Sequence, residues 1–154
     1  TLLLSSDAAV SLDRGSSAIG VVIQDHTVRC VAAAYSEPLP GVSSSEVAEA
    51  MALRRAVYLA RQENCMHVII QSDCLSVVQR LHSSARDRSI VGSIIANIKT
   101  TCGALSSVTF KHVRWQCNVL ARVLARSSLN SLSLCFYHSA PDCIRETLCN
   151  MFLD

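Results

Sequence analysis

The sequence has no apolar run long enough to cross a membrane. A transmembrane helix needs about 18–20 consecutive apolar residues, and no hydrophobic stretch among these 154 residues approaches that length. The N-terminal segment TLLLSSDAAV also lacks the basic region that opens a signal peptide. We therefore expect an intracellular protein that does not associate with membranes.

Charged and aromatic residues are scarce as well. Charged residues make up 17% of the chain and aromatic residues 5%, whereas hydrophobic residues make up 50%. An intrinsically disordered chain has the opposite balance of charge and hydrophobicity. A chain of this length and composition can bury a sizeable core, so we expect one folded domain, present as a monomer.

Paired cysteine motifs are missing. The eight cysteines are scattered over apolar segments, and no two follow the Cys-x-x-Cys spacing. This pattern favours free thiols in a reducing compartment, the nucleus or the cytoplasm, over a disulfide framework or a zinc site. A metal-binding role near the end of the chain stays open for Cys135, Cys143 and Cys149.

Acidic residues are absent from a long central segment. Between Arg88 and Ala140 there are six Lys and Arg residues but no Asp or Glu, although the whole chain has a net charge of only +2. A basic segment beside an acidic one is typical of a protein that binds a polyanion and holds cations nearby. The alternative is a solvated basic face without a partner.

Hydrophobic periodicity predicts three strands in a meander, followed by alternating helices and strands. Strands are predicted over 2–6, 18–24, 28–35, 67–71 and 108–113, and helices over 43–64, 75–81, 90–102 and 118–127. The segment 36–42, with two prolines and a glycine, is predicted to be a loop. This order favours an α/β fold with a mixed sheet and helices on its faces.

The first predicted helix carries a carboxylate where the pattern calls for an apolar side chain. Ser43 and Glu46 have the spacing of a capping box. Glu49 lies on the apolar stripe of the helix, together with Ala50, Leu53, Val57 and Ala60. Burying an unpaired carboxylate costs several kcal/mol, so Glu49 needs a cation, a metal ion or solvent at the helix end.

Two other acids are placed to meet Glu49. Asp7 is predicted to end the first strand and Asp73 the fourth. If these strands are adjacent and parallel, both side chains emerge at the carboxyl edge of the sheet, where open α/β sheets bind ligands. Clustered carboxylates repel each other unless a divalent cation lies between them, and all-oxygen ligation suits Mg²⁺. The alternative is that both acids are strand-end caps, with Asp73 capping the helix at Leu75.

Four short motifs occur in a characteristic order: S-D-A-A at 6–9, A-E-A-M-A-L at 48–53, Q-S-D at 71–73 and H-V-R-W-Q-C-N at 112–118. Together they resemble the type-1 ribonuclease H family, and more narrowly the plant ribonuclease H-like domains of retrotransposon-derived reading frames. The likeness covers residues 1–129, and we expect 130–154 to form a C-terminal tail, whose ending PDCIRETLCNMFLD is similar to tails of the plant group. The resemblance implies a five-stranded mixed sheet, three strands antiparallel and two parallel, with helices on both faces.

The resemblance also implies an activity, the hydrolysis of the RNA strand of RNA–DNA hybrids with two Mg²⁺ or Mn²⁺ ions. It implies that Asp7 bridges both ions, while Glu49 and Asp73 help to hold the ion on the leaving-group side. His112 matches the family's histidine before the last helix, which is thought to assist proton transfer or product release. The alternative for His112 is an ordinary residue at the edge of the sheet.

The basic segment is expected to bind the hybrid, or RNA, through phosphate contacts. Lys111, Arg114 and Asn118 are the residues we expect to contact the nucleic acid. Trp115 beside Arg114 has two open interpretations, stacking on the substrate or packing at a strand-to-helix junction.

The sequence departs from the family at the fourth carboxylate. In the family this acid lies ten residues after the histidine and four after the asparagine, and that position is Arg122 here. A guanidinium cannot be deprotonated, and two unit charges about 5 Å apart at an effective dielectric of about 20 interact by about 3 kcal/mol. Unless Arg122 turns into solvent, it would weaken binding of the ion that activates the attacking water. The alternatives to an active nuclease are a non-catalytic nucleic-acid-binding module and an interaction domain.

Overall fold

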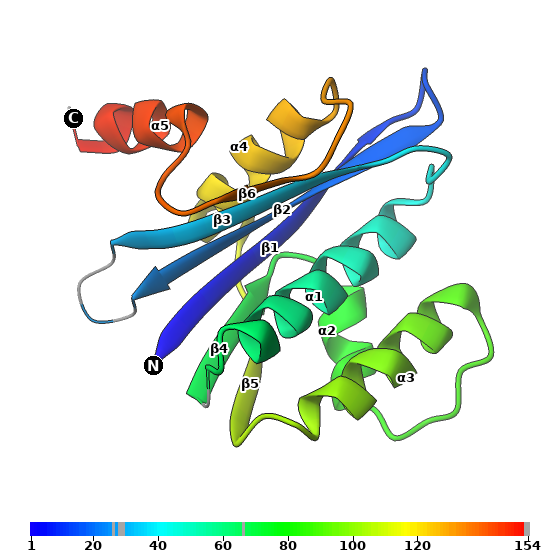
Figure 1. Cartoon of the computed structure of the whole chain (residues 1–154). Coiled ribbons are helices and arrows are strands. Elements are labelled where there is room, and N and C mark those ends of the chain that lie inside the picture. The colour runs from blue at the N-terminus through cyan, green and yellow to red at the C-terminus, as the bar shows by residue number, and fades with distance from the viewer. Residues whose placement is uncertain (26, 28–29, 66, 153–154) are drawn as a thin grey trace.

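A six-stranded mixed sheet carries the fold in the computed structural model, which describes residues 1–25, 27, 30–65 and 67–152 (Figure 1). The strand order is β5-β4-β1-β2-β3-β6. The strands are β1 (Leu2–Ser11), β2 (Ser16–Asp25), β3 (Val31–Leu39), β4 (His67–Ser72), β5 (Ser107–His112) and β6 (Cys135–Tyr137). The pairs β1–β4 and β4–β5 are parallel and the others antiparallel, so the predicted mixed sheet is confirmed with one strand more than expected.

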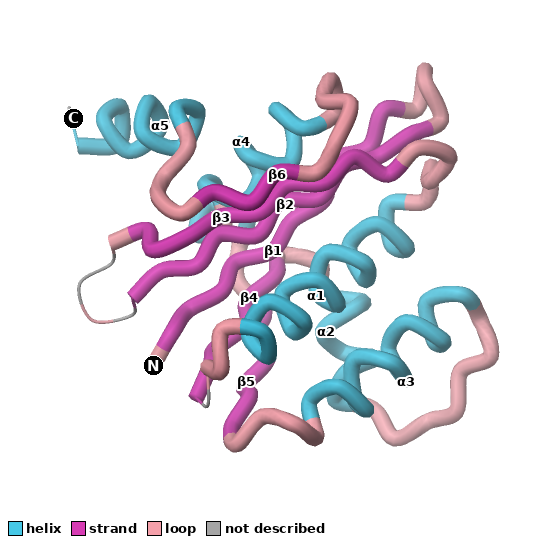
Figure 2. The backbone as a smooth tube through the Cα atoms, viewed as in Figure 1, coloured by secondary structure: helices cyan, strands magenta, loops and turns pink. Residues whose placement is uncertain are grey.

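Helices cover both faces of this sheet (Figures 1 and 2). The helices are α1 (Ser45–Gln62), α2 (Leu75–His82), α3 (Ile90–Cys102), α4 (Val119–Ser128) and α5 (Asp142–Phe152), with a 3₁₀ turn η1 (Trp115–Cys117) before α4. On one face α1 packs on the central strands and α3 packs on α1; on the other face α4 packs on β1 and β2, and α5 packs on α4. No helix among the described residues is both long and apolar enough to span a membrane.

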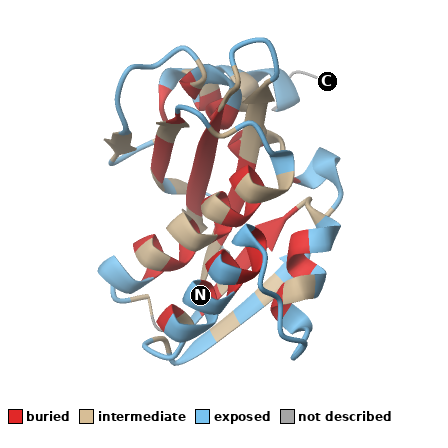
Figure 3. Ribbon diagram, turned by 90° about the vertical axis from the view of Figure 1, so that its right-hand side faces the viewer, coloured by how far each residue is buried: buried red, intermediate tan, exposed pale blue. Residues whose placement is uncertain are grey.

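The alternation of side chains along β2 explains the two layers. Ile19, Val21 and Ile23 belong to the larger core cluster beneath α1, whereas Val22 belongs to the smaller cluster beneath α4. Successive residues of a strand point to opposite faces, so a continuous apolar run is expected of a strand buried on both sides. Figure 3 shows this arrangement, with the central strands buried and the outward faces of the helices exposed.

The first three strands are longer than predicted. β1 continues through Asp7 to Ser11 because β2 pairs with it along its whole length, down to Ser11↔Ser16. β3 continues through most of the predicted loop 36–42, and Pro38 lies beyond the residues of β3 that pair with β6. Proline is tolerated there because that part of β3 is an edge. The first two residues of the predicted third strand, 28–29, lie outside the described residues.

The predicted capping box does not form. Ser44, not Ser43, is the N-cap of α1, and its side chain accepts a hydrogen bond of 3.3 Å from the backbone N–H of Val47. Glu46 instead accepts hydrogen bonds from Ser76 and Arg80, at 2.8 and 3.1 Å. The carboxylate therefore joins α1 to α2 rather than capping its own helix.

The segment after α4 is more regular than predicted. Residues 135–137 add strand β6 antiparallel to β3, with Tyr35 opposite Phe136. The fully buried Ile144 then anchors α5 beneath α4. A strand of three residues is too short to show a recognisable periodicity in the sequence. It forms because the edge of β3 is free to pair with it.

Helix α4 approaches β2 so closely that only glycine fits at position 20. A Cβ on Gly20 would lie 2.7 Å from both the carbonyl oxygen of Ala121 and the backbone nitrogen of Ala125. Both are backbone atoms of α4, so a side chain at this position would push the whole helix outward. Because α4 also carries Arg122, Gly20 sets the distance between that residue and the sheet.

We predict that Gly20→Ala destabilises the protein by roughly 1–3 kcal/mol, the usual effect of forcing extra volume into a packed core. Urea unfolding would measure the change. Gly103→Ala is the matched control, since its Cβ would come no closer than 3.3 Å to Thr100 and Gly103 has a helical φ of −58°. Equal unfolding midpoints for the two variants would contradict the close approach of α4 to β2.

Candidate metal and nucleic-acid site

The site begins where the parallel pairing of β1 with β4 stops. The last paired residues are Ser6 and Ser72, while β1 continues for five more residues along β2. Beyond Ser6 one flank of β1 is therefore free. The prediction that Asp7 ends its strand is therefore wrong. Asp7 is the first residue of β1 beyond the part that pairs with β4.

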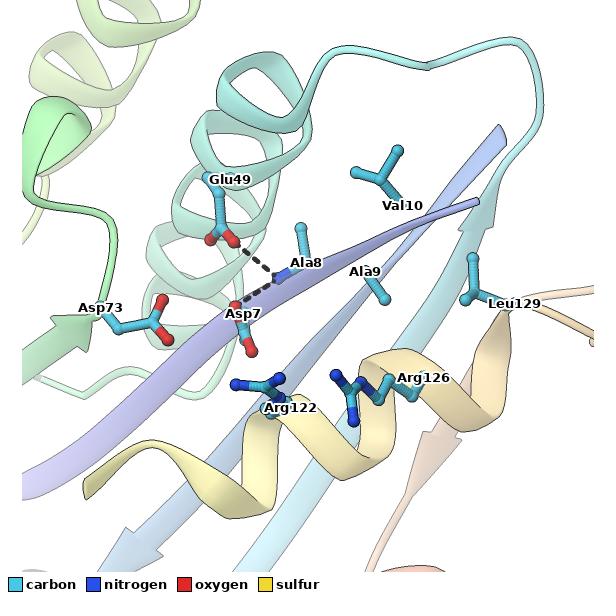
Figure 4. Close-up of a pocket in the computed structure, with 9 residues that line it drawn as sticks. All are labelled: Asp7, Ala8, Ala9, Val10, Glu49, Asp73, Arg122, Arg126 and Leu129. Carbon is cyan, nitrogen blue, oxygen red and sulfur yellow. Dashed lines mark hydrogen bonds between the residues drawn. The ribbon is translucent and has the colours of Figure 1, made fainter. Parts of the chain in front are cut away.

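Side chains from both layers reach this free flank. Asp7 is paired with Gly20, and paired residues point to the same face, so its side chain points toward α4. Glu49 approaches from α1 (Figure 4). The backbone N–H of Ala8 donates to Asp7 Oδ1 at 2.9 Å and to Glu49 Oε1 at 3.3 Å. One backbone donor, left unpaired by the end of β4, thereby joins the two carboxylates.

Asp73 completes a cluster of three carboxylates. It directly follows β4, and one carboxylate oxygen from each of Asp7, Glu49 and Asp73 lies within 4.8 Å of the others. Asp7 and Glu49 are 4% and 7% exposed, and Asp73 is partly exposed. Asp73 does not cap α2, because the N-cap position belongs to Cys74 and the N–H of Cys74 donates to Ser72 Oγ.

Burial makes this cluster unfavourable without a cation. Loss of solvation raises the pKa of Asp7 to about 6, with a further upward contribution from the charge of Asp73. The pKa of Glu49 is raised further still, first by burial and then by the charge of Asp7. Glu49 Oε2 is buried and has no hydrogen-bond partner. An orphaned carboxylate oxygen amid three clustered acids fits a hard divalent cation that prefers oxygen ligands.

The opposite side of the same pocket is basic. Arg122 and Arg126, both on α4, line a cavity of about 300 Å³ together with the three carboxylates (Figure 4). Arg122 does not turn fully into solvent, since its guanidinium carbon lies 5.5 Å from the ring centroid of Trp115. Its positive charge also opposes, by a small amount, the upward shift that burial causes in the pKa of Asp7. Arg126 is not among the predicted site residues, although its spacing of four from Arg122 places both on one helix face.

Two buried amides fix the position of this wall. Asn118 is 1% exposed, and its side-chain nitrogen donates to the Ser6 carbonyl at 2.8 Å. Gln71 donates to Ser5 Oγ at 2.8 Å and to the Cys117 carbonyl at 3.2 Å. Asn118 therefore holds the start of α4 against β1. Because its side chain is buried, a nucleic acid cannot reach it, and it positions the helix instead of contacting the substrate.

The other predicted nucleic-acid contacts and the predicted catalytic His112 lie at the end of β5 or just beyond it. Lys111, His112 and Arg114 are exposed, and His112 stands opposite Ser72, the residue before Asp73. None of the three lines the carboxylate pocket. Trp115 is 55% exposed, so it does not fill a core position at the strand-to-helix junction, and its described ring contact is with Arg122.

The cysteines do not form a second metal site among the described residues. All eight thiols are free. The group of ligand-type side chains close enough to share an ion consists of Asp7, Glu49 and Asp73.

Comparisons with known proteins agree with this architecture. Residues 5–128 match the family model described as reverse transcriptase-like. The fold resembles the N-terminal RNase H domain of a Mycobacterium tuberculosis protein, solved as a fusion with maltose-binding protein (TM-score 0.76, 15% identity, covering 84% of this chain and 94% of that one). It also resembles RNase H1 of the halophilic archaeon Halobacterium salinarum (TM-score 0.77, 18% identity, 84% and 97%).

A third similar structure is LC11-RNase H1 in complex with an RNA/DNA hybrid (TM-score 0.75, 20% identity, 84% and 97%). Comparison with curated proteins gives no match. At these identities the structural likeness is one of fold.

We predict that Asp7→Asn stabilises the ion-free protein, because it removes a buried charge from the cluster. The pKa of Asp7 is raised from 3.8 to about 6, so between these values the native state binds more protons than the unfolded state. The wild type should therefore lose stability relative to the variant as the pH rises from about 4 to about 6. The gap should reach roughly 1–3 kcal/mol, measured by urea unfolding in EDTA across this range.

The control for this experiment is Asp142→Asn, which changes a carboxylate whose side chain is 88% exposed. It should shift stability by only a few tenths of a kcal/mol. Addition of Mn²⁺ should raise the melting temperature of the wild type and of the control, but not of Asp7→Asn. An equal rise in all three proteins would contradict an ion site at Asp7.

Proposed function

The chain belongs to the reverse transcriptase-like family and has the ribonuclease H-like fold, and from this premise we propose that it hydrolyses the RNA strand of RNA–DNA hybrids. The observation that carries the proposal is the convergence of three carboxylates from β1, α1 and the end of β4. The complex of LC11-RNase H1 with an RNA/DNA hybrid supports the choice of substrate.

In this proposal Asp7, Glu49 and Asp73 would hold two Mg²⁺ or Mn²⁺ ions, with Asp7 contributing to both ion sites and the other two acids to one of them. The bound ions would stabilise the charge that develops at phosphorus during in-line displacement. The chain contributes the fixed placement of the three acids. Ala8 orients two of them through its N–H, and Asn118 holds β1 in place through Ser6.

The end of β5 supplies the remaining proposed roles. His112 lies exposed at the same edge of the sheet as Asp73, where it would assist proton transfer or product release. Lys111 and Arg114 flank it and are exposed, so they would bind phosphates of the hybrid. Binding through such contacts weakens as salt rises.

Arg122 is expected to slow this activity. Its guanidinium stands in the pocket where the family has the acid that helps to hold the second ion. This same observation favours the alternative function, a non-catalytic module that binds nucleic acid or a protein partner. The nuclease would cleave an RNA–DNA hybrid with multiple turnovers, whereas the non-catalytic module would not cleave it.

We also propose a narrower origin and setting for the chain. The order of motifs and the ending after Pro141 favour the plant, retrotransposon-derived subgroup. We propose residues 1–129 as the nuclease-type domain and 130–154 as a C-terminal addition to it, in a monomeric protein. Eight free thiols favour a reducing intracellular compartment, the nucleus or the cytoplasm.

We predict cleavage of a labelled RNA–DNA hybrid that requires Mg²⁺ or Mn²⁺ and is resolved on a denaturing gel. Asp7→Asn should lower the rate by at least roughly 100-fold, since even residues that only orient metal ligands contribute 10–100-fold. Asp142→Asn should cleave like the wild type. Equal cleavage by wild type and Asp7→Asn would refute the metal role, and no cleavage by folded wild type with Mn²⁺ would favour the non-catalytic alternative.

We predict that Arg122→Asp raises kcat, because it exchanges repulsion of the second ion for a ligand. An interaction of about 3 kcal/mol corresponds to a rate gain of up to roughly 100-fold. Arg122→Gln, which removes the cation without adding a ligand, should give a smaller gain. An unchanged kcat for Arg122→Asp with intact folding would show that Arg122 does not limit turnover.

A further inference from the structure

We propose that Arg122 and Arg126 form a phosphate-binding pair, which takes one phosphodiester of the nucleic acid directly on the wall that faces the three carboxylates. This inference rests on the proposed nucleic-acid substrate. Both arginines belong to α4, four residues apart, and both side chains extend into the pocket opposite Asp7 (Figure 4).

The first supporting observation is that these two guanidinium groups are unpaired. Among the residues that the structure describes, neither donates a hydrogen bond or forms an ion pair, even with the carboxylates across the pocket. Arg55, Arg80 and Arg145 are each paired with a carboxylate, whereas Arg114 and several other surface arginines in the described part of the chain are unpaired as well. The two arginines of α4 differ from those unpaired arginines in lining the carboxylate pocket. Each guanidinium offers five N–H donors in a planar fork that matches phosphate oxygens. The pair on α4 therefore has its whole donor set available to a ligand.

The second observation is that Arg122 has a preferred position at the pocket. Its guanidinium lies over the face of Trp115 at 5.5 Å from the ring centroid, and a cation is attracted to the face of an aromatic ring. Asn118, at the start of the same helix, is fixed to β1 through the Ser6 carbonyl. A donor group that is held before the ligand arrives loses less conformational entropy on binding.

The third observation is the charge of the pocket. With one divalent cation on the three carboxylates, the acids, the cation and the two guanidinium groups would together carry a net charge of +1, which a single phosphodiester would neutralise. The lining thus suits a phosphate group that contacts the arginines of α4 and lies next to a cation held by the carboxylates.

The test is binding of a fluorescently labelled RNA–DNA hybrid in EDTA, measured by anisotropy over a series of salt concentrations. Arg122→Gln and Arg126→Gln should each raise Kd about 5- to 10-fold at low salt. Each should reduce the slope of log K against log salt by about 0.9, the value for one lost phosphate contact. Arg122→Lys, which keeps the charge but not the fork, should keep the slope and lose only part of the affinity.

The matched control is Arg145→Gln, an exposed arginine on α5 paired with Asp142. It should leave Kd within about twofold of the wild type and the slope unchanged, and thermal unfolding checks that each variant is folded. The proposal is overturned if the α4 variants match this control in both Kd and slope, or if Arg122→Lys loses as much of the slope as Arg122→Gln.

Cleavage with Mn²⁺ separates this inference from the proposed activity. If wild type binds the hybrid through the two arginines but does not cleave it, the phosphate-binding pair stands and the nuclease proposal fails. If wild type cleaves but Arg122→Gln and Arg126→Gln keep its KM and salt slope, the phosphate-binding pair is wrong and the nuclease proposal stands. The pair also predicts that Arg122→Asp raises KM while it raises kcat.

Discussion

The early end of β4 beside β1 is the feature on which the rest of the site depends. Because parallel pairing stops at Ser6 and Ser72, the N–H of Ala8 has no strand partner on that flank and instead binds Asp7 and Glu49. A longer β4 would occupy this N–H and close the gap that Glu49 enters from α1. The antiparallel pairing with β2 continues through the same residues, so β2 bounds the gap on its other side. A backbone donor, rather than a side chain, thus sets the spacing of the buried acids.

The pocket built at this gap has two walls of opposite charge. Its acidic wall is buried and raises the pKa of both Asp7 and Glu49, which means that ionisation there is unfavourable until a cation is present. Its basic wall on α4 is half-buried or exposed, and the close contact of Gly20 with α4 fixes its distance from the sheet. The proposed metal ion would satisfy the acidic wall, and the proposed phosphate would satisfy the basic wall. Arg122 links the two, since it lies near enough to Asp7 to influence that carboxyl but stacks on Trp115.

The site was easiest to predict where a residue did not match the hydrophobic pattern of its helix. Glu49 on an apolar stripe marked the site because a buried acid needs a partner. The convergence of Asp7 and Asp73 was expected only if the first and fourth predicted strands were adjacent and parallel, and β1 and β4 do pair in this way. Other features depend on tertiary contacts that periodicity does not report. β1 continues beyond Asp7 because it pairs with β2, and strand β6 forms because the edge of β3 is free. The Ser43–Glu46 capping box is lost because Glu46 binds Arg80 instead. The spacing of Arg126 from Arg122 was visible in the sequence, but its significance required the pocket.

The most direct test of the central claim, that the three carboxylates form a divalent-metal site, is calorimetric titration of the protein with Mn²⁺. Wild type should bind the ion and release protons. Metal ligands must be deprotonated, and the pKa values of the Asp7 and Glu49 carboxyl groups are raised above their usual range. Titrations in buffers of different ionisation enthalpy measure that release. Glu49→Gln should weaken binding at least about 10-fold. Absence of binding to wild type, or equal affinity in Glu49→Gln, would contradict the account.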